Sequence, residues 1–145
     1  KYDLPSGLLY SSILEMAELC PEKEAVQDEN EIWSFSKLVR KSWFVQNKLQ
    51  QEGCIPGDLV GIFMPKSNYQ IASVLGVLMN GCTYVPIDIQ QPKKRINEII
   101  EQAGIKYVLI KGKQIRPDKL SMFFSWCDSI QDEIQIIQWS ENDLA

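Results

Sequence analysis

Hydrophobic and polar residues follow one another along the chain in two spacings, which together predict a protein of both helices and strands. The first block with helical spacing is Leu8–Leu19, where Ser11 and Ser12 are possible caps and Pro21 ends the helix. Two short apolar runs then flank a polar turn in EAVQDENEIWSF (residues 24–35), which predicts a β-hairpin. The chain is therefore expected to open with a helix and a hairpin.

The centre of the chain alternates helical spacing with continuous apolar runs, a pattern typical of parallel strands joined by helices. Three helices are expected, each between a residue that can begin a helix and a glycine that can end one: Ser36 to Gly53, Ser67 to Gly81, and Pro92 to Gly104. The expected strands are Leu59–Phe63, whose continuous apolar run is typical of a buried strand, then Thr83–Pro86 and Lys106–Ile110. This order predicts a βαβαβ half of a doubly wound sheet.

The spacing also predicts which faces of these helices are buried. The first helix has its apolar stripe at Leu38, Val45 and Leu49, and the middle helix is apolar on so many sides that we expect it to be covered on more than one. The last helix has apolar residues at i, i+3, i+4 and i+7: Ile96, Ile99, Ile100 and Ala103.

The domain organisation predicted from these patterns has three parts within one unit, residues 1–145. An entry helix plus hairpin occupies 1–35, the βαβαβ core occupies 36–110, and a less regular tail occupies 111–145. In the tail, SMFFSW is a short apolar cluster and EIQIIQW predicts a last strand.

Composition and charge narrow the class of protein. The chain has 145 residues, of which 45% are hydrophobic and 23% charged, the balance of an ordinary globular domain with a proper core. A net charge of −4 disfavours a general nucleic-acid binder, which normally has a basic face. No run approaches the roughly 20 apolar residues of a membrane span, and the first residues lack a signal-peptide pattern. We therefore expect no nucleic-acid partner, no membrane and a cytoplasmic location.

The cysteines and histidines exclude several kinds of site. The four cysteines, Cys20, Cys54, Cys82 and Cys127, are widely separated and form no Cys-x-x-Cys pair, so reduced thiols are expected rather than a disulfide framework or a zinc site. The chain contains no histidine, which removes every catalytic arrangement that depends on one.

Candidate chemistry lies in the loops after the strands, because ligands of open α/β sheets bind beyond the carboxyl ends. These loops are MPKSN, PIDIQQP and KGKQ, and none has the glycines of a phosphate-binding loop. Lys66 and Ser67 could bind a phosphate oxygen, but a helix cap beside an exposed lysine is the preferred interpretation. Lys93, Lys94 and Arg95 could attract an anion, but a solvated helix face is preferred.

Three further residues have both a structural and a functional interpretation. Asp88 could be a general acid or a metal ligand, yet such a site needs a second carboxylate, and Asp58, Glu98 and Glu101 are not expected on its side of the sheet. A turn-forming Asp88 is preferred. Trp33 and Phe35, on the far strand of the hairpin, are expected in the core rather than in a ligand platform.

The segment LMNGCTYVPIDIQQPKKRI resembles a core motif of the adenylate-forming (AMP-binding) enzymes, most of all the amino-acid adenylation domains of nonribosomal peptide synthetases. The family pattern is Leu-Lys-Ala-Gly-x-Ala-Tyr-Val-Pro-Leu/Ile-Asp-Pro followed by Tyr-Pro-x-Glu-Arg. It is matched here at Leu78, Gly81, Tyr84, Val85, Pro86, Ile87, Asp88, Pro92 and Arg95. WSFSKL, GCIPGDLVGI and the final SENDLA resemble further family segments in the same order.

The resemblance implies the fold and the reaction. The fold is a three-layer Rossmann-like part-sheet, the N-terminal portion of the large subdomain. The reaction uses ATP and Mg²⁺ to form an aminoacyl-adenylate, which a phosphopantetheine thiol of a carrier protein then takes up. Rival interpretations are a D-alanine–carrier-protein ligase, an acyl- or aryl-CoA ligase, and a non-catalytic α/β interaction module.

The resemblance also implies where the chemistry is not. In the family, the Gly/Ser/Thr-rich phosphate loop and the catalytic lysine come after the segments matched here, so the chain is expected to be truncated before the phosphate loop. No catalytic, cofactor-binding or metal-binding residue is therefore assigned within residues 1–145. The expected partners are the remainder of the adenylation domain, a carrier-protein domain, and an amino acid or other carboxylic acid.

Overall fold

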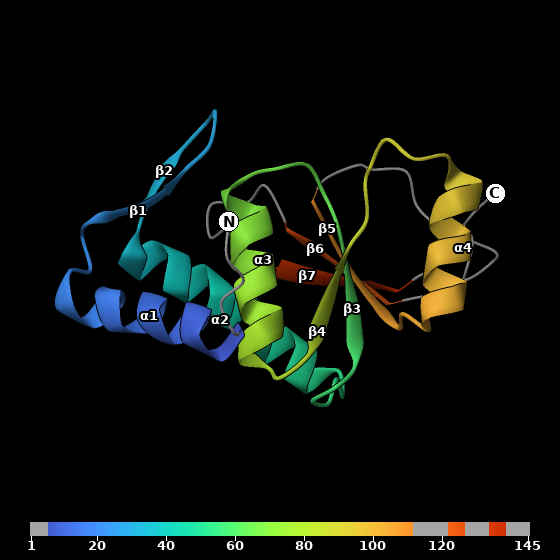
Figure 1. Ribbon diagram of the computed structural model, residues 1–145, viewed down its shortest axis with the longest axis horizontal. Helices are drawn as coiled ribbons and strands as arrows, with labels where there is room; N and C mark the ends of the chain where they lie inside the picture. The colour runs from blue at the N-terminus through green and yellow to red at the C-terminus, as the bar shows by residue number, and fades with distance from the viewer. Residues whose placement is uncertain (1–5, 112–121, 127–133, 139–145) are drawn as a thin grey trace.

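A mixed five-stranded sheet lies between two layers of helices in the computed structural model of the protein (Figure 1). The structure describes residues 6–111, 122–126 and 134–138, with side chains for residues 10–111. The helices are α1 (Ser6–Leu19), α2 (Phe35–Gln51), α3 (Asn68–Met79) and α4 (Lys93–Ala103). The strands are β1 (Glu24–Gln27), β2 (Ile32–Ser34), β3 (Leu59–Phe63), β4 (Thr83–Pro86), β5 (Tyr107–Lys111), β6 (Met122–Trp126) and β7 (Ile134–Gln138).

The sheet has the strand order β4-β3-β5-β6-β7, and its first four strands are parallel. β3 pairs with both β4 and β5, as expected for the two crossovers through α3 and α4. β7 pairs antiparallel with β6, while β1 and β2 form a separate antiparallel hairpin. The predicted βαβαβ order and the α/β class are therefore confirmed.

Two apolar clusters occupy the two faces of the sheet because successive strand residues point to opposite faces. On β3, Val60 and Ile62 belong to the cluster that includes α2 and α3, while Phe63 belongs to the cluster that includes α4. On β5, Leu109 joins the first cluster and Val108 the second. Figure 1 shows the same arrangement, with α4 on one side of the sheet and α1, α2 and α3 on the other.

Helices α2 and α3 approach each other closely at a glycine. A Cβ added at Gly76 would lie 2.4 Å from Val45 Cβ and 2.6 Å from the backbone oxygen of Ser42. The amide of Gln46 also donates a hydrogen bond to the carbonyl of Met79 across this interface, at 3.0 Å. The apolar middle helix is thus covered by helices on one side and by the sheet on the other, as its sequence predicted.

The beginnings of the first two helices differ from the prediction. α1 begins at Ser6, so Ser11 and Ser12 lie inside the helix and are not its caps. α2 is capped by Ser34, whose hydroxyl accepts a 3.1 Å hydrogen bond from the Lys37 backbone N–H, and not by Ser36. The cap moves because the hairpin strand ends at Ser34 and the helix begins directly after it, at Phe35.

Two further expectations need correction, one for Phe35 at the start of α2 and one for Ala103 at the end of α4. Phe35 is the first residue of α2 rather than part of the strand, although Trp33 is fully buried as predicted. In α4, Ile96 and Ile100 are buried but Ala103 is exposed, because the helix stops at its left-handed Gly104 (φ 69°) and Ile105 fills the core after the turn.

The tail contributes two strands to the sheet. Met122–Trp126 of the cluster SMFFSW forms β6, which pairs in parallel with β5, and the predicted last strand is confirmed as β7. The predictions that involve Cys127, the loop after Lys111 and the segment SENDLA lie outside the described residues. No helix in the described part of the chain combines the length and apolar content that crossing a bilayer requires.

Candidate functional site

A hollow of about 650 Å³ lies at the carboxyl edge of the parallel strands, where the hairpin turn faces the loop between β3 and α3. In Figure 1 this edge is the upper one, toward which the tip of the hairpin also points. Most of its lining residues are of polar or charged types, and they come from three elements: Gln27, Asp28, Glu29 and Asn30 of the hairpin; Pro65, Lys66, Ser67, Gln70 and Ile71 around the start of α3; and Lys111 of β5.

Asp28 joins the hairpin to the start of α3. One carboxylate oxygen accepts hydrogen bonds from the backbone N–H groups of Asn30 and Glu31, at 2.8 and 2.9 Å, which forms the hairpin turn. The other oxygen accepts the backbone N–H of Asn68 at 2.8 Å, and the Asn68 side chain donates to Glu31 O at 3.0 Å. These backbone N–H groups, that of Asn68 first, hold the pKa of Asp28 below its ordinary value of 3.8.

The first turn of α3 therefore already has its partners. The Ser67 hydroxyl accepts the backbone N–H of Gln70 at 3.2 Å, as a cap does, and the Asp28 carboxylate accepts that of Asn68. A carboxylate at this position satisfies the positive end of the helix dipole that a phosphate would otherwise use. The structural interpretation of Ser67 is confirmed, and Lys66 is exposed beside it.

Asp88 lies in its own turn and does not line this hollow. Its carboxylate accepts the backbone N–H of Gln90 at 2.9 Å, and its carbonyl accepts that of Gln91 at 3.3 Å. This is a turn of the kind that aspartate forms after a strand. The side chain is exposed, and no group of three or more His, Cys, Asp or Glu among the described residues is placed to hold a metal ion.

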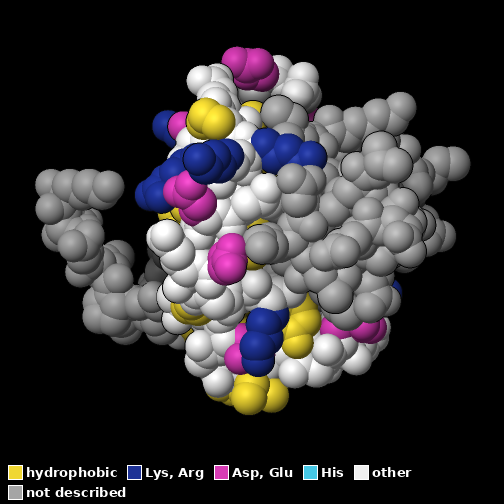
Figure 2. Space-filling view, turned by 90° about the vertical axis from the view of Figure 1, so that its right-hand side faces the viewer, with side chains coloured by type: hydrophobic (Ala, Val, Ile, Leu, Met, Phe, Trp, Pro, Cys, Tyr) yellow, Lys and Arg dark blue, Asp and Glu magenta, His cyan; other side chains and the backbone are white. Residues whose placement is uncertain are grey.

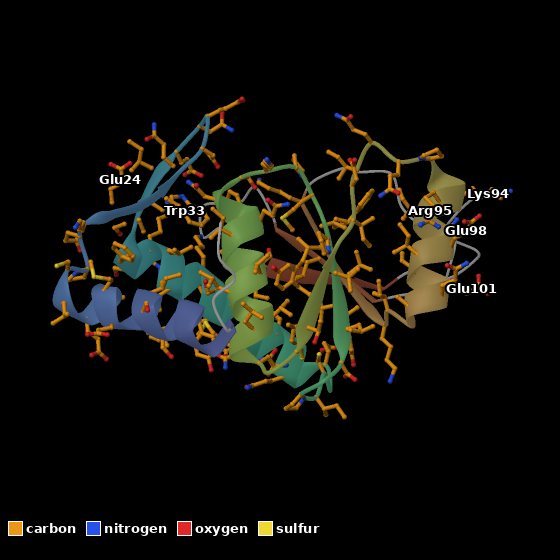
Figure 3. All side chains as sticks on the ribbon, in the orientation of Figure 1. Glu24, Trp33, Lys94, Arg95, Glu98 and Glu101 are labelled. Carbon is orange, nitrogen blue, oxygen red and sulfur yellow. The ribbon has the colours of Figure 1, made fainter. Side chains whose placement is uncertain are left out.

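The basic residues at the start of α4 form a solvated face. Lys93, Lys94 and Arg95 are all exposed, and Arg95 pairs with Glu98 one turn later at 3.4 Å. Figure 3 shows Lys94, Arg95, Glu98 and Glu101 together along α4. Figure 2 looks onto this side of the molecule and shows basic and acidic side chains next to one another, so their opposite charges compensate.

The arrangement can order loops and present polar groups, but its described residues contain no catalytic pair. The charged groups that line the hollow are Asp28, Glu29, Lys66 and Lys111, and the Lys111 ammonium lies 4.2 Å from the centre of the Tyr69 ring. Among the lining residues that the structure describes, no nucleophile has an adjacent base.

Sequence reasoning missed two features that depend on residues far apart in the chain. The contact of Asp28 with Asn68 joins residues 40 positions apart. Cys54 and Cys82, 28 positions apart, have their sulfur atoms 3.3 Å from each other. The sequence predicted the hairpin turn around Asp28, but it did not predict that the Asp28 carboxylate would bind Asn68 at the start of α3.

Replacing Asp28 by Asn tests this connection through its pH dependence. A carboxyl whose folded-state pKa is depressed contributes stability above its unfolded pKa, and that contribution is lost as the pH falls through the folded value. We expect Asp28→Asn to melt at a lower temperature than wild type at pH 7, and the difference to shrink as the pH falls below the ordinary pKa of 3.8. Thermal melting by circular dichroism from pH 7 to about 2 measures it.

The matched control is Glu29→Gln, which removes the same charge from the exposed neighbouring position. It should melt like wild type across the range. Parallel pH profiles for Asp28→Asn and wild type would contradict the role given to Asp28.

Comparisons with known proteins agree with the fold. The sequence model of the AMP-binding enzymes matches residues 14–143. Syringomycin synthase SyrB1 of Pseudomonas syringae pv. syringae is 32% identical over 72% of this chain and 17% of its own length. Gramicidin S synthase 2 of Brevibacillus brevis is 38% identical over 68% of this chain and 2% of its own length.

A solved structure extends this similarity to three dimensions. The crystal structure of the nonribosomal peptide synthetase FmoA3 superimposes with a TM-score of 0.69 and 35% identity, over 72% of this chain and 11% of that one. The chain therefore spans a small part of each of these relatives, 17% of SyrB1 and 2% of gramicidin S synthase 2.

Proposed function

The chain belongs to the AMP-binding enzyme family, and from that membership we propose that it is part of an ATP-dependent ligase of the nonribosomal peptide synthetase kind. In this proposal the ligase joins an amino acid to the α-phosphate of ATP and releases pyrophosphate. It then transfers the aminoacyl group to the phosphopantetheine thiol of a carrier protein in the cytoplasm. The observation that supports it is the family match over residues 14–143, together with the agreement in fold with a peptide synthetase.

The described residues around the hollow at the start of α3 do not fit a site for ATP and Mg²⁺. A phosphate needs several free backbone N–H groups, yet the start of α3 is already satisfied by Ser67 and by the Asp28 carboxylate. A Mg²⁺ ion needs oxygen ligands, and the described part of the chain brings no three acidic side chains together. We propose that these residues contribute the scaffold, and that phosphate binding belongs to other segments of the ligase.

The 145-residue chain should therefore bind neither ATP nor an amino acid. We expect isothermal titration calorimetry with Mg-ATP to give no heat beyond dilution, and amino-acid-dependent ATP–pyrophosphate exchange to stay at background. The reason is that the helix terminus nearest the polar hollow is capped from within the chain. Exchange above background by this chain would contradict the scaffold role.

The proposed ligase activity is tested by sequencing the gene beyond the codon for Ala145 and assaying the longer product. If the reading frame continues beyond Ala145, a Gly/Ser/Thr-rich loop should follow shortly, and the longer product should catalyse the exchange with one amino acid. A panel that adds D-alanine, fatty acids and aryl acids, with hydroxylamine as the acceptor, separates the amino-acid ligase from the D-alanine, acyl and aryl alternatives. A continuing frame without such a loop would contradict the ligase.

A further inference from the structure

Two loops meet at the amino ends of β3 and β4, on the edge of the sheet opposite the polar hollow. Figure 1 shows them at the lower ends of these strands: one joins α2 to β3 and the other joins α3 to β4. The backbone N–H of Gly57 donates to Gly81 O at 3.0 Å, and that of Thr83 donates to Asp58 O at 3.0 Å. Backbone hydrogen bonds therefore hold the two loops in a defined register.

Each loop carries one cysteine whose backbone is held in place. The backbone N–H of Cys54 donates to Leu49 O at 2.9 Å, and that of Cys82 donates to Val77 O at 3.1 Å. The Asn80 amide lies 3.4 Å from both Cys54 O and Cys82 Sγ. The sulfur atoms of the two cysteines are consequently held 3.3 Å apart, with each residue 5% exposed.

The surroundings of Cys54 combine a neighbouring hollow with burial that keeps this thiol protonated. Cys54 lines a hollow of about 520 Å³, together with Ile55, Pro56 and Gly81 of the same two loops. Burial, followed by the hydrogen bond with Cys82, raises the pKa of Cys54 to about 12. Because the thiolate is the reactive form, oxidation of this pair should be slow compared with that of an exposed thiol.

We propose that Cys54 and Cys82 form an oxidation site, at which hydrogen peroxide converts the two thiols into an intramolecular disulfide that joins the α2–β3 loop to the α3–β4 loop. The sulfur atoms already lie in contact, and the loops that carry them are fixed to each other by the backbone. The site is independent of the ligase activity proposed above, because it needs no nucleotide or amino acid.

The reaction balances with peroxide as the oxidant. Cys54, a residue of the hollow's lining, loses its proton and attacks one oxygen of the peroxide, giving a sulfenic acid and water. Cys82 then loses its proton and displaces the hydroxyl from that sulfur, giving the disulfide and a second water. Two thiols and one peroxide thus yield one disulfide and two water molecules, and each sulfur is oxidised by one electron.

The cross-link should stabilise the native fold. It would close a chain segment between residues 28 positions apart, and such a constraint lowers the entropy of the unfolded chain more than that of the folded one. For a chain of this size the stabilisation expected from such a loop corresponds to a rise in melting temperature of about 8 °C.

The experiment treats the folded 145-residue protein with hydrogen peroxide and then blocks remaining thiols with N-ethylmaleimide. Trypsin cleaves after Lys66 and so separates Cys54 from Cys82, which makes the disulfide visible by mass spectrometry as peptide 49–66 linked to peptide 67–93. A second sample uses the variant C20S/C127S, in which these two cysteines are the only ones, so that pairs with Cys20 or Cys127 cannot form, and non-reducing gel electrophoresis separates the monomer from any intermolecular dimer.

We expect the linked peptide in both samples, a melting temperature about 8 °C higher in the oxidised variant, and reversal of both by dithiothreitol. Adding Cys82→Ser to the variant should abolish the rise in melting temperature. In the wild-type protein, Cys54 and Cys82 should react with peroxide more slowly than the exposed Cys20 does. Two free thiols remaining after oxidation, sulfinic acids in place of the link, or a linked protein that melts at or below the reduced temperature would each overturn the proposal.

Discussion

Replacing Gly76 by Ala should lower the free energy of unfolding by about 3 kcal/mol, although alanine is the better helix former. The added methyl group would lie 2.4 Å from Val45 Cβ and 2.6 Å from the carbonyl oxygen of Ser42. Both contacts belong to the facing helix, and a backbone oxygen cannot move without moving that helix. Because α2 and α3 must separate to make room, packing against the sheet is lost as well. Urea unfolding followed by tryptophan fluorescence measures the change.

Gly61→Ala is the matched control, since it also adds a methyl group in the core. There the nearest atom is the terminal Cδ1 of Ile87, at 3.0 Å, which belongs to the end of a flexible side chain. We expect a loss below about 1 kcal/mol, because this atom can shift by a few tenths of an ångström. Equal losses for the two variants would show that α2 and α3 are not in close contact at Gly76.

Replacing Trp33 by Ala should cost about 4 kcal/mol, the range of large aromatic residues removed from a core. Trp33 is 0% exposed, and its ring meets that of Tyr69 edge to face with the centroids 4.8 Å apart. Figure 3 shows it where the hairpin meets the helices. Its loss would leave a cavity between β2 and α3, so the hairpin should also loosen. Urea unfolding by circular dichroism gives the free energy, and hydrogen exchange at Asn68 reports on the hairpin contact.

Trp43→Ala provides a control of the same chemistry on α2, where the side chain is 49% exposed and should cost less than about 1 kcal/mol. Trp33→Phe is the second control. It keeps most of the ring but removes the indole N–H, which is buried and has no hydrogen-bond partner within the described part of the chain. Phenylalanine should therefore recover more than half of the loss seen with alanine. Similar losses for Trp33→Ala and Trp43→Ala would contradict the burial assigned to Trp33.

The parallel strands end at two opposite sides of the sheet, here called its carboxyl edge and its amino edge, and these have different roles in the proposals. The carboxyl edge carries the polar hollow, where Asp28 occupies the start of α3. The amino edge carries the thiol pair, where two loops are fixed by backbone hydrogen bonds. A disulfide at the amino edge can therefore change stability without touching the residues at the carboxyl edge.

Local patterns in the sequence determined most of the fold, because periodicity, caps and turn residues act over a few positions. The strand Thr83–Pro86, the cap at Ser67 and the left-handed Gly104 all lie where these patterns place them. Asp88 follows the same logic, since an aspartate after a strand forms its own turn. The family motif indicated the class of enzyme from sequence alone, because it too is a local pattern within one short contiguous segment.

Tertiary structure decided whatever depends on residues distant in the chain. Ser34 caps α2 in place of Ser36 because the hairpin strand runs directly into the helix, and Met122–Trp126 becomes a strand because it pairs with β5. The helix contact at Gly76 and the pairs Asp28–Asn68 and Cys54–Cys82 likewise arise from packing. Periodicity carries no signal for these contacts, because their partners come from separate elements whose relative positions are set by the shared core.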